Sequence, residues 1–181
     1  MRLIAGSRLL PTCRRMSLIR VASFLALCAC TAHAGESATM RAADAGVDPE
    51  FCPALKAIVA AAPSGFTSLR GAVQDGGENV WQGTRRFPGA ASCLTFGGQP
   101  PAYMCTLYAG DAEDNADGVY DRAVAGTKDC LGDWKTTENV SGVHVRTTTA
   151  TGSGTPKVRV VSHDVSGDAW LVELWVDAAK P

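Results

Sequence analysis

The residues of this chain best suited to chemistry are four cysteines that lie beyond residue 50. They are Cys52, Cys93, Cys105 and Cys130. A cysteine thiolate can attack an electrophile or ligate zinc, and both roles need a reduced thiol. No two of the four form a Cys-x-x-Cys pair, the spacing typical of zinc sites. An even set of cysteines in an exported chain is instead typical of disulfides, so we expect two structural bridges.

Histidine and the acidic residues suggest weaker alternatives. His163 and Asp164 are adjacent near an expected turn, where they would serve as base and orienter for a hydrolytic nucleophile, but no Gly-x-Ser-x-Gly occurs. Residues 113–118 resemble the start of a calcium loop, but the twelfth position is Val124 instead of a bidentate glutamate. The sequence therefore predicts no catalytic, cofactor-binding or metal-binding residue. A small secreted hydrolase using dispersed carboxylates or the His–Asp pair remains the alternative.

Three aromatic residues are the candidates for recognition: Trp81, Tyr103 and Trp175. We expect them on a sheet face opposite the helices, where aromatic side chains can anchor a partner protein. The alternative is a second small hydrophobic cluster that the N-terminal tether or a long loop covers.

The N-terminus has the layout of an export signal. Basic residues, an apolar run over 21–30 and Ala32-His33-Ala34 predict a signal peptide over residues 1–34, and translation starts at Met1 or Met16. Three further cysteines lie in this leader: Cys13, Cys28 and Cys30. Lipidation of Cys30 is an alternative that the sequence favours less. We therefore expect a periplasmic or secreted protein without a transmembrane segment in the mature chain.

The charge of the remaining chain is acidic. The leader holds five of the 17 basic residues and none of the 18 acidic ones, which leaves 12 basic against 18 acidic residues. This balance argues against nucleic-acid binding, which needs a basic footprint. Residues 35–47 are small and polar and predict a flexible tether, and residues 48–181 are long enough for one domain with its own core.

Residues 48–181 predict two helices and two groups of strands. The helices are expected over 52–62, where apolar residues recur at helical spacing, and from an N-cap at Asp111 to Trp134. The expected strands are 66–73, 80–87, 91–96, 102–108, 142–149, 158–163 and 169–176. The order helix, meander, helix, meander predicts an α+β fold with two helices on one face of an antiparallel sheet.

Geometry favours one of the three possible cysteine pairings. Cys93 and Cys105 flank a turn at 97–101 symmetrically, so a hairpin places them opposite each other at the short separation that a disulfide needs. Cys52 begins the first helix and Cys130 lies near the end of the second. Antiparallel helices bring these two ends together, so we predict a Cys52–Cys130 bridge.

The predicted order of elements is similar to that of secretion chaperones and of small periplasmic inhibitor or immunity proteins, a likeness of architecture alone. It implies a non-enzymatic domain that inhibits, neutralises or escorts another envelope or secreted protein, without a cofactor. The cysteine assignment points the same way, because the bridges remove the best nucleophiles and metal ligands from the list of reactive groups.

Overall fold

The computed structural model describes residues 47–141, 145–165 and 169–179. All of them belong to one compact unit, Met40–Pro181. The predicted signal peptide over 1–34, with Cys30, lies outside the described residues, as does the predicted tether except for its last residue, Val47. These assignments stay predictions. In the part of the chain that is described, no helix has the length and apolar character needed to cross a bilayer.

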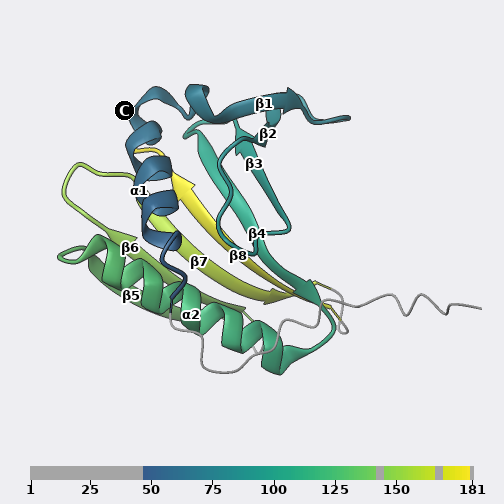
Figure 1. Ribbon diagram of the computed structural model, residues 1–181, viewed down its shortest axis with the longest axis vertical. Helices are drawn as coiled ribbons and strands as arrows, with labels where there is room; N and C mark the ends of the chain where they lie inside the picture. Colours follow the sequence, from purple (N-terminus) through teal and green to yellow (C-terminus); the bar gives the residue numbers. More distant parts are fainter. Residues whose placement is uncertain (1–46, 142–144, 166–168, 180–181) are drawn as a thin grey trace, which may run out of the picture. The chain divides into compact units, whose positions relative to one another are not determined.

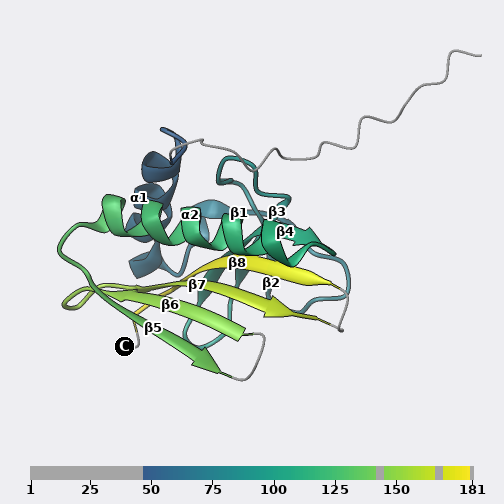
Figure 2. The ribbon, with the colours of Figure 1, turned by 90° about the horizontal axis from the view of Figure 1, so that it is seen from below.

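Eight antiparallel strands form a single sheet, and both helices pack on one of its faces (Figures 1 and 2). The predicted α+β class is confirmed. The helices are α1 (Phe51–Ala61) and α2 (Glu113–Leu131). The strands are β1 (Arg70–Val73), β2 (Val80–Gly83), β3 (Ser92–Phe96), β4 (Ala102–Gly110), β5 (Lys135–Ser141), β6 (Val145–Thr151), β7 (Lys157–Asp164) and β8 (Trp170–Asp177).

The sheet consists of two equivalent halves. Each half is a helix followed by a four-stranded meander, and the last strands of the two meanders, β4 and β8, pair antiparallel at the centre. The strand order is therefore β1-β2-β3-β4-β8-β7-β6-β5, with β1 and β5 at the two edges. Two short 3-10 turns, Ala62–Ser64 and Thr67–Leu69, connect α1 to β1.

Several predicted elements differ from the structure, three of them for identifiable reasons. The first strand does not start at Phe66, because that residue has a φ of 59° and leads into a 3-10 turn. Asp111 is not the N-cap of α2, since Ala112 occupies that position without a side-chain cap. The strand β5 was not predicted, because its sequence is polar and all but one of its residues are exposed.

The core lies between the helices and one face of the sheet. Val172, Leu174 and Val176 alternate along β8 and are fully buried, as their spacing predicts. They pack with buried residues of α1 and α2, among them Ile58 and Tyr120. This layer excludes water from the helix-facing side of the sheet and contributes most of the apolar burial.

A glycine marks the place where α1 and α2 cross. Gly126 is buried in α2, and a Cβ atom there would lie 2.8 Å from Val47 Cγ1 and 3.0 Å from the Phe51 ring. Any larger residue would push α1 away from α2. The close approach explains a glycine that otherwise weakens the helix by about 1 kcal/mol.

Both predicted disulfides are confirmed. Cys52 and Cys130 join the start of α1 to the end of α2, with Cα atoms 5.2 Å apart and a sequence separation of 78. Cys93 and Cys105 are directly opposed across β3 and β4, with Cα atoms 4.1 Å apart and a sequence separation of 12. One bridge therefore fixes the two halves to each other, and the other clamps a hairpin near the centre of the sheet.

Candidate functional site

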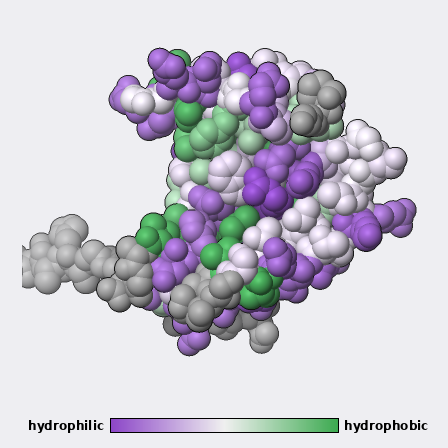
Figure 3. Space-filling view, turned by 180° about the vertical axis from the view of Figure 1, so that it is seen from behind, coloured by the Kyte–Doolittle hydropathy of each residue, from purple (hydrophilic) through white to green (hydrophobic). Residues whose placement is uncertain are grey.

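The candidate site lies on the sheet face opposite the helices. Strand alternation sends Trp175 of β8 to this face, because its neighbours Leu174 and Val176 point into the core. No helix of the described residues packs on this side. Viewed from behind, the surface shows apolar areas beside hydrophilic ones (Figure 3). An antiparallel sheet whose second face faces water usually presents polar side chains there, so the apolar areas are informative.

An aromatic pair stands at the centre of this face. Trp175 stacks on Phe96 with ring centroids 5.5 Å apart and planes inclined by 20°. The indole Nε1 of Trp175 donates a hydrogen bond of 3.0 Å to Glu173 Oε2. The guanidinium of Arg159 lies 5.3 Å from the Trp175 ring centroid. These contacts hold the indole in one orientation.

Four polar side chains around Trp175 lie in two contacting pairs. Arg159 donates two hydrogen bonds to Asp177, of 2.7 and 3.0 Å, and the two side chains are 32% and 19% exposed. His163 Nε2 lies 3.7 Å from Glu173 Oε2. We call these residues the Trp175 cluster: Phe96, Arg159, His163, Glu173, Trp175 and Asp177. Because Arg159 and Asp177 are already paired, a partner can cover these two charges without leaving either of them unpaired.

Half-exposed aliphatic residues and threonines surround the cluster. Val161 is paired with Glu173 across β7 and β8, and Leu171 follows on the same face. Thr147 and Thr149 face the same side from β6, opposite Val161 and Arg159. The site therefore combines an aromatic pair and four ionisable side chains with aliphatic and hydroxyl groups at its border.

Only one of the three predicted aromatic residues lies on this face. Trp175 is there, but Tyr103 is 1% exposed and points toward the helices, where its ring lies 5.9 Å from that of Phe66. The prediction for Tyr103 is therefore wrong. Its hydroxyl donates to the carbonyl of Arg85 and accepts from the Arg85 N–H, which anchors the segment after β2. Burial raises the pKa of Tyr103, and the hydrogen bond to Arg85 offsets part of that rise.

Trp81 also lies on the other side of the sheet. It pairs with Thr95, which is fully buried on the same side as Tyr103. The guanidinium of Arg70 lies 4.0 Å from the Trp81 ring centroid. The prediction that Trp81 and Trp175 share a face is therefore corrected, because the register of β2 places the two indoles on opposite faces.

His163 and Asp164, which the sequence suggests as a catalytic pair, lie on opposite faces of the sheet. His163 faces the open side of β7, opposite Leu171, whereas Asp164 is the next residue of the strand and pairs with Trp170 on the other side. The carboxylate that accompanies His163 on its own face is Glu173. Cross-strand proximity of this kind depends on register, so the adjacent pair in the sequence gave a misleading signal.

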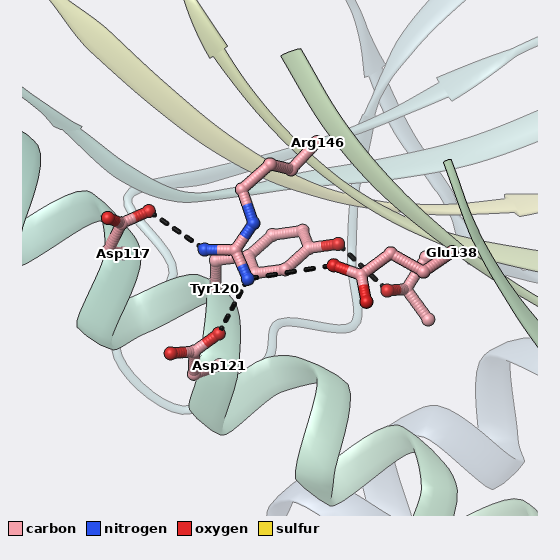
Figure 4. A network of polar contacts seen from close by, with 6 residues as sticks. Asp117, Tyr120, Asp121, Glu138 and Arg146 are labelled. Carbon is pink, nitrogen blue, oxygen red and sulfur yellow. Dashed lines mark hydrogen bonds and ion pairs between the residues drawn. The ribbon is translucent and has the colours of Figure 1, made fainter. Parts of the chain in front are cut away.

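A second polar network links α2 to the edge of the sheet (Figure 4). Arg146 of β6 contacts Asp117 at 3.0 Å, Asp121 at 3.1 Å and Glu138 at 3.6 Å, and its guanidinium stacks over the Tyr120 ring at 4.3 Å. Burial lowers the pKa of Arg146, but the hydrogen bond to Asp117 and the charge of Asp121 outweigh it and raise the pKa overall. Sequence reasoning missed this network, since its members come from three separate elements.

Metal chemistry has no candidate ligand set in the described ranges, where no group of three or more His, Cys, Asp or Glu side chains could hold an ion. The four cysteines of this region are all oxidised.

Comparison with known proteins adds no relative. The chain matches no protein-family model, and neither the curated proteins nor the solved structures gave a significant match.

Proposed function

We propose that this protein is an exported, non-enzymatic binding domain that holds another envelope or secreted protein against the open face of its sheet. As an inhibitor, immunity or escort protein it would act by covering or carrying that partner. The single observation that carries the proposal is the half-buried Trp175–Phe96 stack on a sheet face that bears no described helix. The disulfides are compatible with the oxidising compartment that export implies.

The energetics of association favour this surface. Tryptophan is enriched among the residues that dominate binding energy, especially where neighbouring contacts exclude water. Trp175 is held by Phe96, Glu173 and Arg159 before any partner arrives. A partner therefore loses little free energy in ordering the indole, because the preorganised side chain has few rotamers left to give up.

The decisive experiment compares two tryptophan variants of the full exported protein. The partner is captured from envelope extract of the source cells with the wild type, purified, and titrated by calorimetry. Trp175→Ala should weaken binding of this partner by about 100-fold, because the variant lacks a hot-spot side chain. Trp81→Ala is the matched control, because this indole lies on the other side of the sheet. Equal weakening by both variants, or failure of the wild type to capture any protein, contradicts the proposal.

A small secreted hydrolase is the second candidate, favoured by one observation. His163 Nε2 lies 3.7 Å from Glu173 Oε2 on the open face, an arrangement in which a carboxylate orients a histidine base. Turnover of a panel of ester and glycoside substrates by the wild type, lost in His163→Gln and retained in Trp81→Ala, would replace the binding function with this one.

A further inference from the structure

The two edges of the sheet differ in their readiness to accept another strand. The edge strand β1 has four residues, and its register with β2 is shifted between Arg70 and Val73. Short and irregular edges resist further pairing. The other edge, β5, has seven residues in unbroken register with β6, from Lys135↔Thr151 to Ser141↔Val145. It contains no proline and no glycine, and no described strand lies on its outer side.

The regular edge offers backbone hydrogen bonds to a partner. In an antiparallel strand, alternate residues point their N–H and C=O groups away from the neighbouring strand. β5 lies at the border of the sheet (Figure 2) and, among the described strands, pairs with β6 alone, so every second residue directs these groups outward. An extended segment can therefore add as a further strand, with main-chain hydrogen bonds supplying affinity and side chains supplying specificity.

The charge at this edge indicates what kind of segment would fit. Glu138, at the middle of β5, faces α2, where Asp117 and Asp121 share a single guanidinium with it, that of Arg146. The Glu138 contact is the longest of the three, and its side chain is 53% exposed. Lys135 sits at the start of the strand and points to the opposite face. The network leaves an excess of negative charge beside the middle of the edge.

The same glutamate disfavours pairing with a second copy of the chain. In a two-fold antiparallel pair of β5 strands over their full length, Glu138 would lie directly opposite its own copy. Like charges in directly opposed positions destabilise a strand pair. The edge is thus protected against self-association, yet stays open to a strand with the complementary charge.

We propose that β5 is a docking edge for an extended basic segment of another protein, which adds as a ninth strand and places a lysine or arginine opposite Glu138. The cation would complete the network of Figure 4 by pairing with the carboxylate that Arg146 holds least closely. Cross-strand neighbours lie close enough for this ion pair. The proposal concerns a surface separate from the Trp175 cluster and does not rest on the function proposed for it.

The test is an NMR titration of the full-length folded protein with capped peptides. The probe is Thr-Thr-Val-Lys-Val-Thr-Thr, and a second peptide carries glutamate in place of the lysine. The lysine peptide should shift the amide signals of residues 135–141 in a saturable manner. The glutamate peptide should bind about tenfold more weakly, because an attraction is replaced by a repulsion.

Variants of the protein test whether the peptide binds at β5 through Glu138. Glu138→Gln should weaken binding of the lysine peptide by about threefold, because one exposed cross-strand ion pair is lost. Asp75→Asn removes the same charge from the turn at the opposite edge and should leave binding unchanged. Shifts centred elsewhere, equal affinity for both peptides, or no saturable shift overturns the proposal. Concentration-dependent shifts of residues 135–141 without peptide would also overturn it, by identifying a second copy as the occupant.

Discussion

Removal of the long-range disulfide should destabilise the protein chiefly through its unfolded state. The perturbation is the double variant Cys52→Ala/Cys130→Ala, compared with Cys93→Ala/Cys105→Ala. The chain-entropy model gives about 4.5 kcal/mol for a bridge between residues 78 apart and about 3 kcal/mol for one between residues 12 apart. Loss of buried sulfur adds about 1–2 kcal/mol for the second pair, since Cys93 and Cys105 are almost completely buried, and about half of that for the first pair, of which Cys130 is buried.

The two variants should therefore lose similar amounts of stability for different reasons, and the denaturant slope separates these reasons. The Cys52–Cys130 bridge holds the unfolded chain compact over much of its length, so its removal should raise the slope m in urea. Removal of the Cys93–Cys105 bridge should leave m nearly unchanged. Because a domain of this size is stable by only about 5–15 kcal/mol, both variants are compared with the wild type in the same concentration of sucrose, which favours the folded state.

The assay is equilibrium urea unfolding followed by tryptophan fluorescence and by circular dichroism, with peptide mapping under non-reducing conditions to verify the bridges. A loss below about 2 kcal/mol for Cys52→Ala/Cys130→Ala, together with an unchanged m, would refute the argument that this bridge constrains the unfolded chain. A larger rise of m for the hairpin pair than for the helix pair would refute it as well.

Three further predictions concern polar groups. Arg146→Met should lower the free energy of unfolding by about 2 kcal/mol at low salt, because three carboxylates lose their shared cation, and by less in 1 M NaCl, as urea titrations at both salt concentrations will measure. Burial raises the pKa of both Tyr103 and Tyr120, so these phenols stay protonated in the folded state at pH values where unfolded tyrosine ionises. The contribution of these two tyrosines to stability should then be constant below about pH 10 and decrease above it, with tyrosinate absorbance at these two sites delayed until unfolding. Thr95→Val should raise the melting temperature, because the fully buried Thr95 hydroxyl has no hydrogen-bond partner among the described residues and valine has the same shape without the buried polar group.

The sequence was sufficient for the parts of the fold that depend on local patterns. Alternation along residues 170–176 predicted the buried side of β8, and the symmetric placement of Cys93 and Cys105 about a turn predicted their pairing. It failed where the outcome depends on a neighbouring strand. The strand β5 exists because β6 pairs with it along its whole length, although its own residues are polar and exposed. No local pattern signals such a strand.

Prediction of the candidate site also failed where the outcome depends on a neighbouring strand. A shift of one residue in register moves an indole in a strand from one face of the sheet to the other. Register in turn is set by the pairing of strands that are distant in sequence. Trp81, Tyr103 and Trp175 look alike in sequence, yet only Trp175 lies on the open face. The ion pairs of Arg159 and Arg146 likewise join residues from different elements, so no spacing rule in the sequence could have identified them.

The positions of the two proposed surfaces in the sheet suggest different binding behaviour. Trp175 lies on β8, a central strand paired on both sides, and its partner across β4, Met104, is adjacent to the bridged Cys105. A site on such a strand is held rigid, and a rigid site selects a partner by shape, because it cannot adapt to a poor fit. The strand β5 is held from one side only, through β6. Its hydrogen-bonding groups accept any extended segment that matches the charge of Glu138. If one partner uses both surfaces, the face should determine which protein binds, and the edge should add affinity through effective concentration. Trp175→Ala would then abolish capture, whereas Glu138→Gln would mainly speed release of a partner that still binds.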